Sequence, residues 1–189
     1  METWVLPGLL GLGLAAASGL RTFLPLLMLS AAVHVEVLGV TLNESMRWLG
    51  STGALVALSI ATVVELTADL IPFVDNALSV IGNVTGPLPG RRDLGGLRDV
   101  DPSTAAIAGI VIGAPTALAF STAQTGTRAV STASTGGLAN PVVSVIEDVV
   151  SFGTSLIALL LPLLVIPLLA FLLWFAWRGA QRVRRLRAT

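Results

Sequence analysis

Four apolar runs, each long enough to cross a membrane, govern what this chain can fold into. A transmembrane helix needs about 20 predominantly apolar residues. The runs that qualify are Trp4–Val33, Trp48–Ile71, Ser103–Ala123 and Phe152–Trp177. Only 12% of the 189 residues are charged, whereas a soluble domain usually carries about 25%. The sequence therefore predicts an all-α, polytopic membrane helix bundle of about four spans, forming one transmembrane domain over residues 1–189.

The first run is too long for one straight helix. From Trp4 to Val33 a continuous helix would measure about 45 Å, against about 30 Å of hydrocarbon. The run must therefore tilt or break. Ser18, Gly19 and Pro25 are the break signals near its middle.

The last apolar segment is also too long, since one helix from Pro141 to Trp177 would exceed about 50 Å. We expect a short helix, Val142–Ser151, and a break near Gly153 that makes this part re-entrant or interfacial. Pro162 and Pro167 should kink the span that follows.

Arginine clusters predict the orientation of the chain. They lie in the loop at residues 91–98 and in the basic tail at residues 178–189, whereas the loop around Ser131–Pro141 carries no charge. The positive-inside rule places the central loop and the tail in the cytoplasm, and four spans place the N-terminus there too. We expect a multi-pass protein of the inner (plasma) membrane, with the lipid bilayer and not nucleic acid as its partner.

Arg21 lies near the middle of the first run, where a charge costs about 2.5–3.5 kcal/mol on insertion scales. Its motif SGLRT (Ser18–Thr22) recurs loosely as TGTRA (Thr125–Ala129), which contains Arg128. A polar-striped helix with two carboxylates follows each motif. The carboxylates are Glu65 and Asp69 after the first motif and Glu147 and Asp148 after the second.

A degenerate internal repeat would explain this order, with half-repeats at about 4–88 and 103–177. Inverted repeats whose broken helices meet at a central site are frequent in transporters. The distance in sequence from arginine to carboxylates differs between the halves, so chance is the alternative.

Charged side chains cannot face lipid cheaply, so these residues should face one another or water. We expect Arg21 to point into the bundle, within salt-bridge reach of Glu65 or Asp69. Polar residues nearby are expected to line the entrances to the site, and they are Asp75, Asn76, Asn140 and Ser144.

Three functions fit these residues. Carboxylates beside hydroxyls suit a hard cation or protons, which predicts a small transporter or channel for an inorganic ion, more specifically a cation. The ion-binding or relay groups are Glu65, Asp69, Glu147 and Asp148, with Arg21 and Arg128 as charge partners. Alternatively, the two arginines hold a lipid-linked or small phosphate. The third reading is a non-transporting scaffold subunit whose ion pairs lock the helices together.

Enzyme motifs are missing from the sequence. The chain has no cysteine and one histidine, and it contains neither a P-loop nor a metalloprotease signature. We expect neither an enzyme nor a bound cofactor, and the residues do not identify a metal.

Small residues recur at every fourth position of the third run and predict a close-packing face. They are Ala105, Gly109, Gly113, Ala117 and Ser121. Such a face serves either a homo-oligomer or packing within one chain.

Three stretches carry a family resemblance: GLGLAAASGLRTFLPLL, ELTADLIPFVDN and GTRAVSTASTGGLANPVVSVIEDV. Together they resemble the bacterial membrane family catalogued as domain of unknown function 4126, from Gly8 to about Trp177. The resemblance implies an integral membrane protein and brings no established activity with it.

Overall fold

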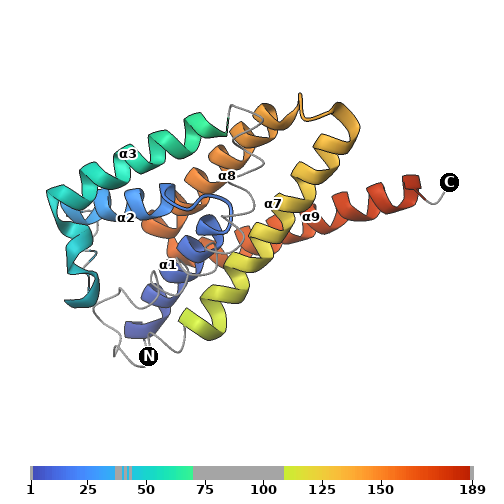
Figure 1. Cartoon of the computed structure of the whole chain (residues 1–189). Helices are drawn as coiled ribbons and strands as arrows, with labels where there is room; N and C mark the ends of the chain where they lie inside the picture. The colour runs from blue at the N-terminus through green and yellow to red at the C-terminus, as the bar shows by residue number, and fades with distance from the viewer. Residues whose placement is uncertain (1, 37–39, 41, 43, 70–108, 188–189) are drawn as a thin grey trace.

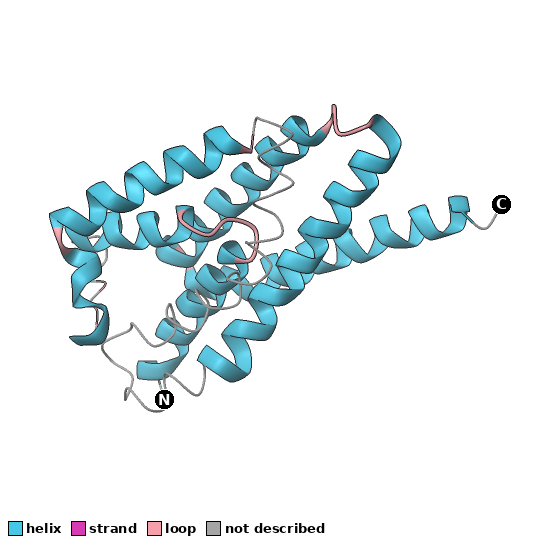
Figure 2. Cartoon of the chain, in the orientation of Figure 1, coloured by secondary structure: helices cyan, strands magenta, loops and turns pink. Residues whose placement is uncertain are grey.

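The computed structural model describes residues 2–36, 40, 42, 44–69 and 109–187, and helices dominate this part of the chain. The α-helices are α1 (Glu2–Ser18), α2 (Leu24–His34), α3 (Thr52–Ala68), α7 (Ala114–Thr135), α8 (Asn140–Leu160) and α9 (Val165–Arg187). Shorter helical turns are η2 (Glu44–Gly50), η3 (Gly109–Gly113) and η4 (Pro162–Leu164). The described residues form no β-strand (Figure 2), so the all-α prediction is confirmed for them.

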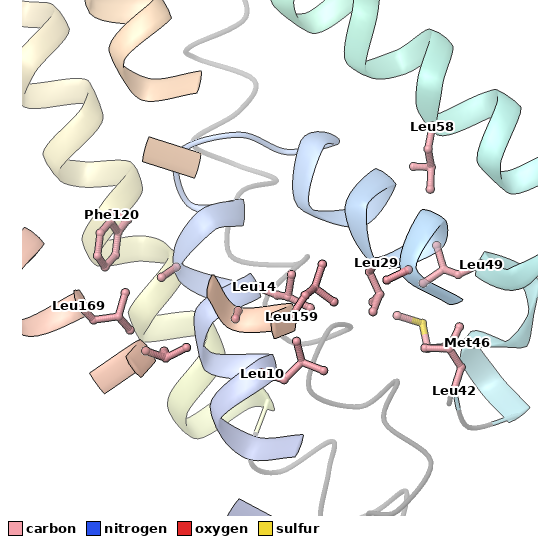
Figure 3. Packing of buried hydrophobic residues seen from close by; sticks show 14 residues of the cluster. Leu10, Leu14, Leu29, Leu42, Met46, Leu49, Leu58, Phe120, Leu159 and Leu169 are labelled. Carbon is pink, nitrogen blue, oxygen red and sulfur yellow. The ribbon is translucent and has the colours of Figure 1, made fainter. Parts of the chain in front are cut away.

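Helix α1 lies at the centre of the arrangement (Figure 1). It packs against α8 and α7, and the start of α9 also contacts it. Helix α3 is attached mainly through α2 and η2. Buried apolar side chains join these contacts, including Leu14 and Leu159 between α1 and α8, and Leu29 beside Leu49 near α2 and η2 (Figure 3).

The first apolar run breaks where its sequence predicts. Helix α1 ends at Ser18 and α2 begins at Leu24, with Pro25 in the first turn of α2, where its missing N–H costs nothing. Gly19 is required in this break, because a Cβ atom there would overlap the carbonyl oxygen of Ala117 on α7.

The last segment also breaks, but the predicted position near Gly153 is wrong. Helix α8 passes straight through Gly153 and ends at Leu160. Leu161 leaves the helical conformation, with φ −138° and ψ 63°, directly before Pro162. The physical reason is that Gly weakens a helix interior by only about 1 kcal/mol, whereas Pro removes a hydrogen bond and clashes with the preceding turn.

Helix α7 is longer at its C-terminal end than the apolar run that predicted it. It continues past Ala123 to Thr135, so the connection to α8 is Gly136–Ala139 and the predicted loop at Ser131–Pro141 is wrong. Hydroxyl side chains in this part donate to carbonyls one turn earlier, as Thr127 does to Ala123 at 3.0 Å. The polar residues therefore bond within the helix, and it ends at Gly136, whose φ is +63°.

The small-residue face predicted for the third run lies on η3 and α7, and it packs inside the chain. Gly113, Ala117 and Ser121 are buried, and α7 contacts α1. Ala105 lies outside the described residues.

Two helical stretches in the described part are long and apolar enough to cross a membrane by themselves, Asn140–Leu160 and Pro162–Gly179. The apolar helices α1, α2 and α3 are shorter. The basic tail begins as part of α9, which stays helical to Arg187.

Candidate functional site

Charged side chains from four separate parts of the chain meet in the interior. Arg21 comes from the break between α1 and α2, Asp69 from the C-terminal cap of α3, Arg128 from α7, and Glu147 and Asp148 from α8. We call these five residues the charged cluster. Both arginines, Asp69 and Glu147 are buried, and Asp148 is 26% exposed.

Asp69 is the centre of the charged cluster. Its Oδ2 atom forms an ion pair with Nη1 of Arg21 and accepts a hydrogen bond from Nη2 of Arg128 at 3.2 Å. The hydroxyl of Ser144 lies 3.4 Å from the same oxygen and donates to it. One carboxylate oxygen therefore links α3 to both arginines and to α8.

The structure tests the prediction that Arg21 points into the bundle and pairs with a carboxylate. It points inward, is 2% exposed, and pairs with Asp69, so this prediction is confirmed. Its Nη2 atom also donates to the hydroxyl and the carbonyl of Ser144, at 2.6 and 3.0 Å. Its Nε atom lies 2.5 Å from Oδ1 of Asp148.

Glu147 has two oxygens in different situations. Oε2 accepts from Nε and Nη2 of Arg128, at 3.1 and 2.6 Å, and from Nε2 of Gln124 at 3.0 Å. Oε1 is buried and has no hydrogen-bond partner in the described part of the protein. A buried carboxylate oxygen without a donor is unusual enough to require an explanation.

Glu65 lies beside the charged cluster and binds backbone N–H groups instead of an arginine. Its two oxygens accept the backbone N–H groups of Thr22 and Phe23, at 2.8 and 3.1 Å. These groups lie at the N-terminal end of α2, where a negative charge is stabilised by unpaired N–H donors and the helix dipole. Of the two partners predicted for Arg21, Asp69 takes the ion pair and Glu65 fixes the break that holds Arg21 in place.

The residues predicted to line the entrances differ in where the structure places them. Ser144 is fully buried and belongs with the charged cluster, so its predicted place at an entrance is wrong. Helical spacing is the reason, because residues three and four apart share a helix face, and Ser144 precedes Glu147 and Asp148 by that distance. Asn140 is buried at the start of α8, where its Nδ2 donates to Thr132 at 3.1 Å. Asp75 and Asn76 lie outside the described residues.

Gln124 is a site residue that the sequence reasoning missed. It bridges Oε2 of Glu147 and the carbonyl of Leu20, at 3.0 and 2.9 Å. The signal was present, since Gln124 precedes Arg128 by four residues and so shares its helix face.

The two arginine motifs have different local structures. SGLRT lies across the break after α1, whereas TGTRA lies inside the continuous helix α7. The internal repeat therefore remains a prediction. Both arginines nevertheless reach the same oxygen of Asp69.

A polar stripe continues from the charged cluster along α8. Ser151, Thr154 and Ser155 follow Glu147 and are buried, and Ser151 donates to the carbonyl of Ala17 at 3.1 Å. The hydroxyl of Ser155 has no hydrogen-bond partner in the part of the chain that is described. The interior face of α8 is thus polar along much of its length.

Charge balance explains how such a site tolerates burial. Three cluster carboxylates face two arginines, so the site is close to neutral with an excess of one negative charge. Paired charges are far cheaper to bury than isolated ones. Within the described ranges, no three His, Cys, Asp or Glu side chains gather in the manner of a metal site.

Comparison with known proteins identifies the family. The sequence model of the family described as Domain of unknown function (DUF4126) matches residues 9–182. The chain belongs to the DUF4126 family. No curated protein and no solved structure matches it. The three stretches that suggested the resemblance supply every member of the charged cluster of this DUF4126 protein.

Proposed function

We propose that this DUF4126 protein is a polytopic protein of the inner (plasma) membrane that moves protons through the charged cluster. The unpartnered Oε1 atom of Glu147 carries the proposal. The carboxylate accepts hydrogen bonds at one oxygen and none at the other. Inside a hydrogen-bonded network, such a group can accept a proton and release it. Ionisable residues inside membrane bundles mark ion pathways and proton relays.

The distribution of side chains supports a lipid environment. On α8 the large apolar residues Val145, Ile146 and Val149 are exposed, while Ser144 and Glu147 are buried. Helix α3 follows the same pattern, since it exposes its valines and buries Thr62. Buried polar side chains beneath an apolar outer surface suit a bundle surrounded by lipid, and such apolar surface is unfavourable in water.

The geometry supplies a chain of contacts for a proton. Asp148 is partly exposed and contacts Arg21, which contacts Asp69. Asp69 contacts Arg128, which contacts Glu147. Arginine stays charged throughout, so its role is to position the carboxylates and hold their charge, while the carboxylates and intervening water carry the proton.

A proton fits this cluster better than a metal ion does. Guanidinium donors already occupy Oδ2 of Asp69 and Oε2 of Glu147. A divalent cation would have to displace these donors and gather several oxygens around itself. A proton needs only one unoccupied oxygen.

The proposed topology follows from the helices and the arginines. The pair α1 and α2 forms one discontinuous span with Arg21 at its break, an arrangement that transporters use around their binding sites. The arginine-rich end of α9 lies in the cytoplasm. Helices α8 and α9 are each long enough to cross the membrane. With an even number of crossings in the whole chain, the N-terminus lies in the cytoplasm together with the end of α9.

A phosphate carrier is the second candidate, because Arg21 and Arg128 converge on one oxygen of Asp69. Two guanidinium groups that share one anionic oxygen could hold a phosphate there instead. This reading requires Asp69 to move aside.

Purified protein in liposomes that contain a pH-sensitive dye tests the proposal. A potassium diffusion potential should drive proton entry faster than in empty liposomes. Uptake of labelled phosphate without proton entry would favour the second candidate. Flux of neither species above empty liposomes would contradict both and leave the scaffold reading.

A further inference from the structure

Helix α9 leaves the rest of the molecule after its first turns. Val165 and Leu169 are buried against the other helices, but every residue from Leu173 to Gly179 is exposed. Figure 1 shows α9 extending away from the other helices toward the C-terminus. The side chains of this part of α9 therefore face the surroundings of the molecule.

One face of this projecting helix changes from aromatic to basic along its length. The residues are Phe171, Trp174, Phe175, Arg178 and Arg182, whose spacing of three and four places them on one helix face. The ring centroid of Phe171 lies 6.3 Å from that of Trp174 and 6.4 Å from that of Phe175. The Arg178 guanidinium lies 5.0 Å from the centroid of the Trp174 ring. We call these five residues the α9 stripe.

The chemistry of the α9 stripe restricts its occupant. No acidic residue follows Asp148 in the sequence, whereas five arginines lie in residues 178–187. The positive charge is therefore not balanced within this end of the chain. An occupant that fits must offer an apolar part beside the rings and a negative group about 10 Å further along the helix axis, which is the rise over seven residues.

We propose that the α9 stripe binds anionic phospholipids, with acyl chains along Phe171 and Phe175 and headgroup phosphates at Arg178 and Arg182. Tryptophan belongs at the level of the headgroups, where one edge is apolar and the other wet, and Trp174 lies between the two regions. Arginine pairs with phosphate through parallel hydrogen bonds. A second copy of the chain fits less well, because its arginine-rich end would repel this one if the stripes met in parallel.

This inference rests on the proposed membrane location, and lipid-specific quenching separates the two. In the full-length protein, Trp4→Phe and Trp48→Phe leave only Trp174 and Trp177 as fluorophores. The protein is reconstituted into vesicles that contain the same small mole fraction of a bromine-labelled lipid, either phosphatidylglycerol or phosphatidylcholine. Each arginine near the surface should enrich the anionic lipid about fivefold, so brominated phosphatidylglycerol should quench more strongly.

Paired variants test the role of the two arginines. Arg178→Gln with Arg182→Gln should reduce the preference by about fivefold for each arginine removed, although Arg184, Arg185 and Arg187 remain. Quenching by brominated phosphatidylcholine should be kept, which shows that the variant is still inserted. Arg47→Gln, at an exposed arginine outside α9, should keep the preference. Equal quenching of the unmodified stripe by both lipids, or a preference that the double change leaves unaltered, would overturn the inference alone. Protection of the tryptophans from both lipids would indicate a protein contact and overturn it too, and failure to insert into any vesicle would contradict the membrane location as well.

Discussion

At the scale of single residues, Arg21 holds more of the charged cluster together than any other side chain for which contacts are described. Its guanidinium group lies within ion-pair distance of all three cluster carboxylates, Asp69, Glu147 and Asp148. We therefore expect Arg21→Ala to lower the free energy of unfolding by about 3–5 kcal/mol, the usual loss when one partner of a buried pair is removed. Thermal unfolding in detergent would measure this, with Arg47→Ala at an exposed position as the control.

The partners of Arg21 make a double-mutant cycle informative. Arg21 is the only described ion-pair partner of Asp148, so Asp148→Asn should recover part of the stability lost in Arg21→Ala. Glu65→Gln should recover none of it, since the Glu65 carboxylate binds backbone N–H groups instead. Equal rescue by both changes would contradict the contacts described for this site.

The sequence could predict which residues meet, but not how they pair. An arginine in an apolar run requires a buried partner. The expected depth of Arg21 in the membrane indicates Glu65 or Asp69 as that partner. The choice between them depended on the exact position of the break, because the freed N–H groups of Thr22 and Phe23 compete for a carboxylate. Sequence spacing does not fix that position to within one residue.

At the scale of helices, the packing of α1 on its neighbours depends on glycine. A Cβ atom at Gly13 would lie 2.5 Å from Cβ of Ala158 and 3.1 Å from Cγ2 of Val165. Gly13→Ala should therefore force α1 away from α8 and lower the unfolding temperature in detergent. Gly153→Ala is the matched control, because nothing lies within 4 Å of that position, and alanine there should be neutral or stabilising. Similar effects of the two changes would count against the α1–α8 contact.

The ends of the helices show which sequence signals terminate a helix and which do not. The sequence predicts a break near Gly153 and a kink at Pro162, and the structure has the break directly before Pro162. Proline cannot donate a hydrogen bond in any environment, whereas glycine within a helix loses only conformational entropy. Helix α7 is longer at its C-terminal end than the apolar run that predicted it. Its hydroxyl groups bond to its own backbone, so polar residues extend the helix.

At the scale of the whole molecule, an apolar surface that covers buried charged and polar side chains favours a membrane bundle, and the arginines of α9 predict its orientation. The chain has no cysteine, so single introduced cysteines report sidedness cleanly. We expect Gly179→Cys to react with an impermeant maleimide only after spheroplasts are opened. His34→Cys, at an exposed position in the predicted outer loop, should react in closed spheroplasts. The reverse pattern would invert the topology.

The central claim is that Glu147 carries protons through a buried site, and proton flux in liposomes tests it most directly. Glu147→Gln keeps the shape of the side chain and its contact with Gln124 while removing the titratable group, so most of the flux should disappear. Glu36→Gln makes the same chemical change at an exposed residue outside the site and should leave the flux unchanged. Thermal unfolding of each variant in detergent establishes that it is folded. A folded Glu147→Gln protein that conducts protons as fast as the unmodified chain would contradict the account.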